Sequence, residues 1–227
     1  MADLDFAPFL LSFKLAFVVT IILFIIALPL SWWLSQTKCR CKPFIEAFTS
    51  LPIVLPPSVL GFYLLYALSY NSPIGAFFEE NFEIKLVFSF TGLVIASCFY
   101  SFPFMVQPLQ SGFESLSSNM IEASYISGKS KLVTLLRVAL PNIKPALITA
   151  IIITFAHTVG EFGVVLMVGG SIPNETKVAS VAIYEMVETM DYHLAHIYSG
   201  IMIGISFVVL LSVYWFNQSQ HRKIGNF

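Results

Sequence analysis

Residues 15–34 read LAFVVTIILFIIALPLSWWL, a run without a single charged side chain. An α-helix needs roughly 20 predominantly apolar residues to cross the hydrocarbon core of a bilayer, so this run is long enough to do so. It is also too long for the apolar region of a cleaved signal peptide, and the preceding MADLDFAPF carries no basic residue. We therefore predict that the run is a first transmembrane helix that is retained.

The composition of the chain predicts an all-α integral membrane protein. Of its 227 residues 57% are apolar and 11% are charged, whereas soluble domains carry about 25% charged residues. Four further runs are long enough to span a bilayer, and none alternates apolar with polar residues as barrel strands do. A shorter stretch, 178–190, holds two glutamates, so we expect it to be interfacial or re-entrant. The four runs are Phe44–Tyr70, Leu86–Val106, Ala146–Val168 and Ile197–Phe216.

These runs predict one transmembrane domain, residues 9–216, with about five spans, or six if 178–190 also crosses, and a cytoplasmic tail, residues 217–227. Lys and Arg concentrate in cytoplasmic loops. Nine of the twelve Lys and Arg residues lie on the cytoplasmic side if the protein is in the plasma (inner) membrane with its N-terminus outside and its C-terminus in the cytoplasm. The outer segments then hold nine acidic and three basic residues, which disfavours the entry of a free anion. The nine basic residues are Lys38, Arg40, Lys42, Lys129, Lys131, Arg137, Lys144, Arg222 and Lys223.

The second predicted span is interrupted by prolines. Its stretch LPIVLPPSVLGF, residues 51–62, contains Pro52, Pro56, Pro57 and Gly61. Proline removes a backbone donor and clashes with the preceding turn, and the freed carbonyls need protein or water partners at membrane depth. A helix broken here indicates burial in a bundle or beside a water-filled path. A kink that only improves packing explains the prolines equally well.

The fourth predicted span also carries a break, in AHTVGEFGVVLMVGG, residues 156–170. His157 and Glu161 are four residues apart and are expected to share a helix face, with Gly160 and Gly163 on either side of the glutamate. An ionisable residue inside a membrane is a candidate functional residue. Alternatively, the two side chains pair with each other and the glycines allow close helix packing.

A charged block, EASYISGKSKLVTLLRVALP, residues 122–141, lies between two apolar runs on the cytoplasmic side. Apolar residues share one face before Gly128 and one face after it, which predicts two short amphipathic helices. Gly128 joins them and is free to take a positive φ, and Pro141 is expected to end the second helix. The block, within a cytoplasmic loop at 114–141, could be a docking surface, a lipid-contacting piece or a linker; its charges favour docking.

The chain carries no arrangement of residues that predicts an enzyme, and we expect neither a cofactor nor a metal. The sequence SGKS, Ser127–Ser130, resembles the end of a phosphate-binding loop, but that loop needs a glycine where position 123 is alanine. Cys39 with Cys41, and His193 with His196, supply too few ligands for a zinc site.

The block at 122–141 resembles the cytoplasmic EAA loop of ABC-importer permeases. That loop reads Glu-Ala-Ala, three residues, Gly, nine residues, Ile, one residue and Leu-Pro. Ser124 stands here in place of the third small residue and Val138 in place of the Ile. The stretches at 51–65 and 160–176 further resemble molybdate permeases and, more loosely, sulfate permeases. The residues that match the loop are Glu122, Ala123, Gly128, Leu140 and Pro141.

The resemblance implies a type-1 ABC-importer permease bundle whose 122–141 loop, including Ser124, forms a coupling helix on a separate ATPase. It further implies two copies of the chain, two ATP-binding subunits and one extracytoplasmic binding protein, with the translocation path for molybdate or tungstate at the homodimer interface. Sulfate or another oxyanion, and a self-contained channel or secondary transporter, are the alternatives. Relatives often have arginine at the position of His157, so a fixed positive charge is not expected there.

A tetrahedral dianion in transit needs hydrogen-bond donors but no tight site, because tight binding would prevent release. We predict that donors along the path are Ser58, Thr154, His157 and Thr158. Glu161 would repel a dianion, so we assign a hinge or structural role to Glu161, Gly160, Gly163, Pro56 and Pro57.

Overall fold

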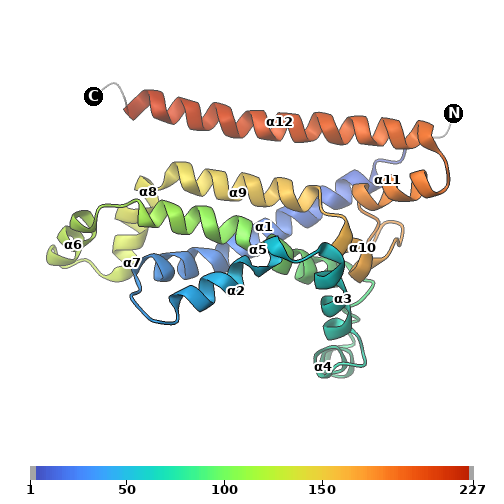
Figure 1. Ribbon diagram of the computed structural model, residues 1–227, viewed down its shortest axis with the longest axis horizontal. Coiled ribbons are helices and arrows are strands. Elements are labelled where there is room, and N and C mark those ends of the chain that lie inside the picture. The colour runs from blue at the N-terminus through green and yellow to red at the C-terminus, as the bar shows by residue number, and fades with distance from the viewer. Residues whose placement is uncertain (1–3, 225–227) are drawn as a thin grey trace.

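The computed structural model describes residues 4–224, and every regular element within them is helical (Figure 1). In chain order the helices are α1 Ala7–Gln36, α2 Lys42–Val54, α3 Pro57–Leu68, α4 Pro73–Phe82, α5 Phe90–Glu114, α6 Ser118–Ile126, α7 Lys131–Thr134, the π-helical turn η1 Leu135–Ala139, α8 Leu140–Asn142, α9 Lys144–Val159, α10 Gly163–Gly169, α11 Ala179–Glu188 and α12 Tyr192–Ile224.

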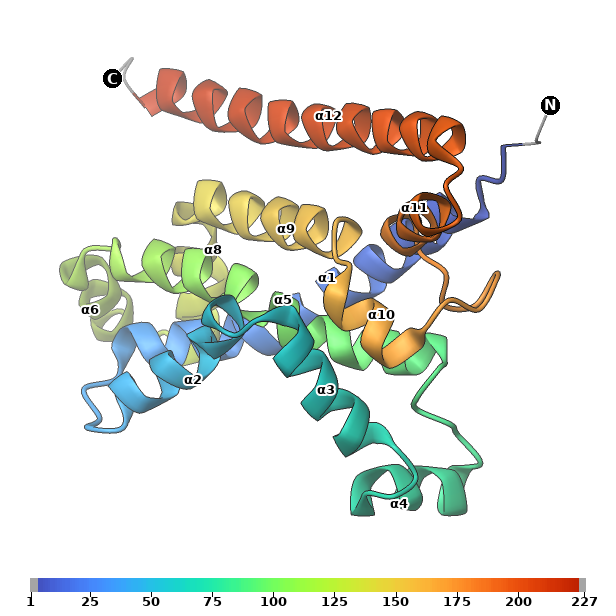
Figure 2. The same cartoon turned by 45° about the vertical axis from the view of Figure 1, so that its right-hand side comes forward.

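Helices α1, α5 and α9 form the centre of the molecule and lie side by side (Figures 1 and 2). Their shared core contains fully buried side chains from α1 and α5, among them Leu15, Leu23 and Leu109. Because lipid tails are as apolar as leucine, helices in a membrane associate through close packing and hydrogen bonds. One such bond joins Ser31 Oγ of α1 to the backbone oxygen of Val106 of α5, at 3.1 Å.

Three helices are long and apolar enough to cross a membrane: α1, α5 and the first part of α12, Tyr192–Ser212. The pair α2 and α3 is bent by 109°, and the chain from 131 to 142 meets α9 at 82°. Each bent pair is a broken span or a re-entrant loop, which gives up to five spans among the described residues. Helix α11 has ten residues, too few to cross.

The predicted break in the second span is confirmed and lies at Leu55–Pro56. Helix α2 ends at Val54, Leu55 and Pro56 have extended backbones with ψ of 136°, and Pro57 begins α3. A residue before proline is driven from helical to extended conformation, and two consecutive prolines impose this twice. Pro52 lies inside α2 and does not end it.

The last helix extends beyond the predicted span on both sides. Helix α12 runs from Tyr192 to Ile224, and the part of it that is long and apolar enough to cross a membrane, Tyr192–Ser212, overlaps the predicted span, Ile197–Phe216. The predicted tail, 217–227, continues the helix through 224 and is outside the described residues beyond that. The polar residues after Phe216 do not break the helix because none of Asn217–Ile224 is proline or glycine.

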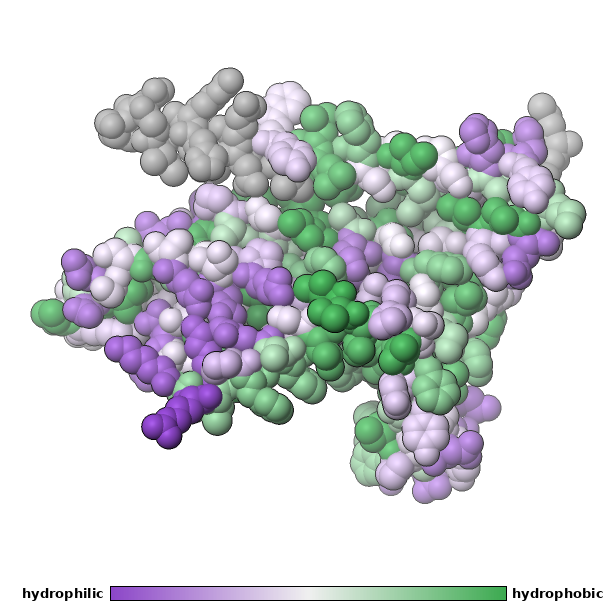
Figure 3. Space-filling model, viewed as in Figure 1, coloured by the Kyte–Doolittle hydropathy of each residue, from purple (hydrophilic) through white to green (hydrophobic). Residues whose placement is uncertain are grey.

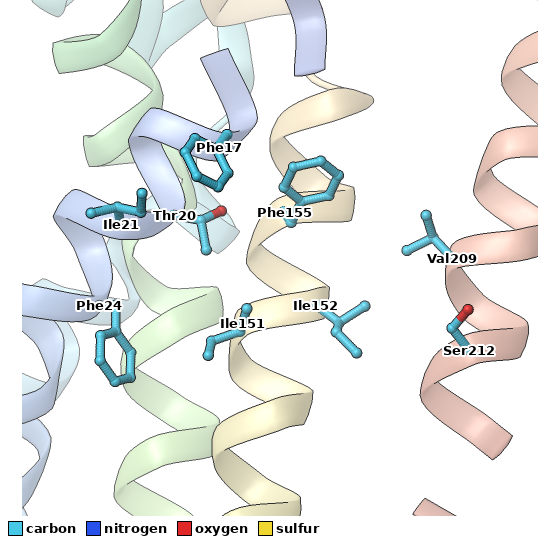
Figure 4. Close-up of a pocket in the computed structure, with 9 residues that line it drawn as sticks. All are labelled: Phe17, Thr20, Ile21, Phe24, Ile151, Ile152, Phe155, Val209 and Ser212. Atoms are coloured by element: carbon cyan, nitrogen blue, oxygen red, sulfur yellow. The ribbon is translucent and has the colours of Figure 1, made fainter. Parts of the chain in front are cut away.

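Helix α12 stands away from the bundle (Figures 1 and 2), and many of its apolar side chains are exposed, including Ile203 and Phe207. A cavity of about 420 Å³ separates it from α1 and α9 (Figure 4); its walls are apolar apart from Thr20 and Ser212. Figure 3 shows hydrophobic surface across the middle of the molecule and hydrophilic surface toward the end that carries α6. Exposed apolar side chains of this kind are expected to face lipid.

The contact between α5 and α9 depends on Gly112, and this dependence gives a stability prediction. A Cβ at position 112 would lie 2.5 Å from Ala146 Cβ of α9, whereas a Cβ at Gly200 of α12 would meet nothing within 4 Å. Overpacking a helix contact costs about 1–3 kcal/mol. Gly112→Ala is therefore expected to lower the unfolding temperature in detergent, and the matched variant Gly200→Ala to leave it unchanged or raise it. Equal effects of the two variants would contradict the packing argument.

Candidate functional site

The 122–141 block forms a helical elbow at one end of the bundle (Figure 1). Helix α6 ends at Ile126, and Gly128 has a φ of 76°. The backbone nitrogen of Gly128 bonds to the Tyr125 oxygen at 2.9 Å, and that of Lys129 bonds to the Ser124 oxygen at 3.2 Å. These bonds close the helix end as a left-handed glycine does in many helices. The prediction of two helices joined at a positive-φ glycine is confirmed.

A buried hydrogen bond fixes the two arms of the elbow. Ser124 Oγ lies 2.9 Å from Thr134 Oγ1, and both side chains are buried. On the outside, Glu122 and Ala123 are exposed together with three apolar side chains. A hydrogen bond therefore holds the inner face of the elbow, and its exposed surface combines apolar with charged side chains, as a docking surface can. The exposed apolar residues are Ile126 (87% exposed), Leu132 and Leu136.

Pro141 does not end the second arm, contrary to the prediction. It lies inside α8, directly after the π-helical turn, in which the Leu140 nitrogen bonds to the Leu135 oxygen five residues back. This wider turn accommodates a residue that lacks a backbone donor. The chain instead turns at Ile143, ahead of Pro145, where the 82° bend leads into α9.

The second discontinuity lies between α9 and α10. Helix α9 ends at Val159, and Gly160, Glu161 and Phe162 are non-helical. Glu161 has therefore left the helix that carries His157, and the predicted shared face is wrong. The predicted close packing is confirmed at Gly163, where a Cβ would lie 2.8 Å from Pro57 Cβ, but not at Gly160, where the nearest atom would be the Ala156 oxygen of α9 at 3.7 Å. The two predicted breaks thus meet, α3 beginning against the start of α10.

His157 lies in the last turn of α9, facing α5. Its Nδ1 is 3.0 Å from Ser101 Oγ, and its ring stacks on Phe104 with 3.9 Å between centroids. Ser101 Oγ is also 2.9 Å from Thr158 Oγ1. Ser101 was missed at the sequence level, although a second buried serine, Ser97, lies four residues before it on the same helix. That spacing on one helix face was the available signal.

The other predicted residues differ in their surroundings. The Thr154 hydroxyl is fully buried without a hydrogen-bond partner among the described residues. Ser58 is exposed in the first turn of α3, where the two breaks meet, and Pro56 and Pro57 are exposed with it. Ser101 therefore lies within hydrogen-bonding distance of both His157 and Thr158. Among the described residues, no hydrogen bond joins Ser58 to any of these three side chains.

Glu161 is 3% exposed, and neither carboxylate oxygen has a hydrogen-bond partner among the described residues. Ser97 of α5 is close to the carboxylate, but outside hydrogen-bonding geometry. The backbone oxygen of Glu161 accepts a hydrogen bond from Ser180 Oγ of α11 at 2.5 Å. No ion pair to Glu161 occurs within residues 4–224. The predicted pairing of His157 with Glu161 is thus absent there.

At the end of the molecule opposite the elbow, Glu185 of α11 binds two residues of the 170–178 loop. Lys177 forms an ion pair with Glu185, and Ser171 Oγ donates to Glu185 Oε1 at 2.7 Å. Burial opposes ionisation of this carboxyl, but the two hydrogen bonds outweigh burial and lower the pKa of Glu185. Glu175 and Glu188 remain exposed.

Residues 6–225 match a family described as the binding-protein-dependent transport system inner membrane component. Since the match covers nearly the whole chain, the protein belongs to this family of membrane transport subunits.

The chain is similar to proteins named as molybdenum or sulfate transport permeases. The chain is 44% identical to the molybdenum transport system permease protein ModB of Azotobacter vinelandii, over 99% of this chain and 98% of the relative. It is 32% identical to a putative molybdenum transport permease of Bacillus subtilis, over 92% of each chain. It is 30% identical to the sulfate transport permease CysT of Salmonella typhimurium, over 91% of this chain and 74% of the relative.

Two solved structures share the fold. The MetNI methionine ABC transporter in inward-facing form superposes with a TM-score of 0.72 at 15% identity, covering 93% of this chain and 94% of the other. A bacterial ABC transporter that imports alginate superposes with a TM-score of 0.76 at 13% identity, covering 94% and 78%. The predicted type-1 ABC-importer permease fold is thereby confirmed.

The buried carboxyl of Glu161 gives a prediction about charge. Burying an ionised carboxylate without a partner is unfavourable, and a neutral amide of the same shape avoids that penalty. Glu161→Gln is therefore expected to leave the unfolding temperature unchanged or to raise it. A clear fall would show that the folded protein relies on an ionised, partnered Glu161, which would contradict the unpartnered carboxyl of the structure.

Proposed function

We propose that this chain is the permease subunit of an ATP-driven importer for molybdate or tungstate. The observation that carries the proposal is the 44% identity, over almost the full length of both chains, to a molybdenum transport permease. The likeness to sulfate permeases is weaker and covers less of those proteins, so sulfate or another oxyanion is the second candidate. A self-contained channel or secondary transporter does not need a docking elbow, because it does not bind a separate ATPase subunit.

The elbow would transmit ATP-driven movement from a separate ATPase subunit. Its outer face offers apolar side chains beside the exposed Glu122 and Ala123, while Ser124 and Thr134 fix its inner face. Leu140 and Pro141 lie where the second arm approaches the bend into α9. A push on the elbow would therefore reach α9 directly.

The translocation path would lie between two copies of the chain, near the meeting point of the two breaks. The partly exposed His157 and the exposed Ser58 would then contact the anion, whereas Thr154 and Thr158 are buried and would support His157. Gly160, Gly163, Pro56, Pro57 and Glu161 would form the hinge. A path with few donors suits an anion that must leave again.

The proposed orientation puts the elbow in the cytoplasm and residues 4–6 outside. In support, the start of α1 and the elbow lie at opposite ends of the bundle (Figure 1). The outer end would carry the exposed Glu80, Glu175 and Glu188, so a free dianion would be repelled there. An extracytoplasmic binding protein with a basic contact face would overcome this repulsion and would associate faster at low salt.

The conformation of Gly128 provides the test of coupling. Because nothing in the described chain lies within 4 Å of its Cβ position, a substitution there strains the backbone through the positive φ without a clash at Cβ. Gly128→Val is expected to add about 1–3 kcal/mol of backbone strain, and to reduce binding-protein-stimulated ATPase activity and anion uptake. Gly128→Asn is the matched control, since asparagine tolerates the left-handed region, and should retain most activity.

Both variants should still insert into the membrane and assemble. Full anion uptake by the Gly128→Val variant would contradict the proposal that the elbow couples the ATPase to transport.

Orientation is tested by labelling single cysteines in a variant that lacks Cys39, Cys41 and Cys98. An impermeant thiol reagent added outside intact cells should reach cysteine at Glu80 or Asn174, which are exposed. It should reach Lys129→Cys only after the membrane is made permeable. Labelling of position 129 in intact cells would reverse the proposed orientation.

A further inference from the structure

Three side chains between α5 and α9 form a chain of hydrogen bonds that fixes where each proton lies. Thr158 Oγ1 is 2.9 Å from the backbone oxygen of Thr154. A carbonyl oxygen only accepts, so Thr158 donates its single hydroxyl proton there. Ser101 Oγ is 2.9 Å from Thr158 Oγ1. Because the Thr158 proton is already engaged, Ser101 is the donor in this second bond.

The third bond of the chain determines the tautomer of His157. Ser101 Oγ is 3.0 Å from His157 Nδ1. Since Ser101 has donated its only proton to Thr158, it accepts here, and Nδ1 carries the hydrogen. A neutral imidazole has one N–H, so Nε2 is then an acceptor without a proton. Nε2 has no hydrogen-bond partner among the described residues, and the side chain is partly exposed.

The surroundings of the ring leave this arrangement undisturbed. The ring lies between Phe104 and Tyr100, with centroids at 3.9 and 4.9 Å. No hydrogen bond or ion pair within residues 4–224 joins His157 to an ionisable group. Helix α10 has none, Lys14 lies over the Phe90 ring, and Tyr198 bonds to the Asp5 backbone. The remaining ionisable groups on α5, in the break after α9 and among the α12 residues whose side chains the structure describes are Cys98, Tyr100, Glu114, Glu161, Tyr192, His193, His196 and Tyr214.

We propose that His157 is a proton-dependent anion contact: neutral, it offers the anion only a lone pair at Nε2, and as imidazolium it offers Nε2–H. The proposal rests on the oxyanion-importer function and adds a mechanism to it. Entry of the anion at this point is coupled to uptake of one proton by Nε2, and loss of that proton turns the contact from attractive to repulsive. A site of this kind binds without retaining its ligand.

The coupling follows from linkage. Two ligands that favour each other on one protein do so reciprocally, by the same factor in each binding constant. A dianion that binds the imidazolium form tenfold better than the neutral form therefore raises the ratio of imidazolium to neutral ring up to tenfold at fixed pH, when the anion is saturating. The coupling depends on the hydrogen bonds from Thr158 through Ser101 to His157, because they place the proton of the neutral ring on Nδ1. A neutral ring with its proton on Nε2 would donate to the anion without taking up another proton.

The tautomer is measured directly by nitrogen-15 NMR on the full chain in lipid nanodiscs, with labelled histidine. The chain has four histidines, and the signals lost in His157→Gln identify this one. At a pH where the ring is neutral, we expect Nδ1 to bear the proton and Nε2 to be bare. A protonated Nε2 in the neutral ring would overturn the inference, whether or not the chain transports molybdate.

Thr158→Val tests the cause of the tautomer. Without the Thr158 hydroxyl, Ser101 is free to donate to Nδ1, so the neutral ring should change to the Nε2–H form. The matched control is Thr20→Val, which removes a buried hydroxyl of α1 that has no partner among the described residues and should leave the tautomer unchanged. An unchanged tautomer in folded Thr158→Val would contradict the proton assignment.

The coupling is tested by adding molybdate, tungstate or sulfate at fixed pH, against chloride at the same ionic strength. The imidazolium fraction of His157 is expected to rise with the transported anion, and to rise less in Thr158→Val. A rise with sulfate alone would support the proton coupling and replace the proposed substrate. No rise with any of the three anions would refute the coupling, while uptake assays would still decide the function.

Discussion

The structure depends on the requirement that backbone polar groups inside a membrane find partners within the protein. Two stretches interrupt the apolar helices, one at Leu55–Pro56 and one at Gly160–Phe162. They pack against each other, Pro57 against Gly163. A break exposed to lipid would leave several groups unpaired at several kcal/mol each, so both breaks must face protein or water. This requirement places the irregular backbone, and the polar side chains beside it, at one location.

Helix α9 connects that location to the elbow. It begins just after the bend at Ile143 and ends at Val159, immediately before the second break. Its 16 residues span about 24 Å at 1.5 Å per residue, close to the thickness of the hydrocarbon core. Because a packed helix moves as a unit, a displacement at the elbow would, in the proposed mechanism, reach His157 and its partner Ser101 through α9. The proposed path and the proposed docking surface are thus two ends of one element.

Sequence rules predicted the features that depend on only a few neighbouring residues. Glycine at position 128 indicated a positive φ, and consecutive prolines indicated the break at 55–56; both effects act within a few residues. The failures involved tertiary context. Gly160 ended α9 one residue before Glu161, so the four-residue spacing to His157 lost its meaning. The π-helical turn accommodated Pro141, which sequence alone could not indicate.

The partner of His157 was likewise beyond sequence reasoning. Ser101 is 56 residues away along the chain, and only the register between α5 and α9 brings the two side chains together. The membrane spans were easier to predict, because length and hydropathy decide them, whereas the continuation of α12 through polar residues to Ile224 was not indicated by hydropathy.

Reconstituted uptake tests the central claim most directly. The chain would be placed in liposomes with and without its ATPase subunit, and labelled molybdate supplied on its binding protein. The account predicts uptake that requires ATP, the ATPase subunit and the binding protein together. Uptake by the chain alone, driven by an ion gradient without the ATPase subunit, would contradict the account and identify a self-contained transporter.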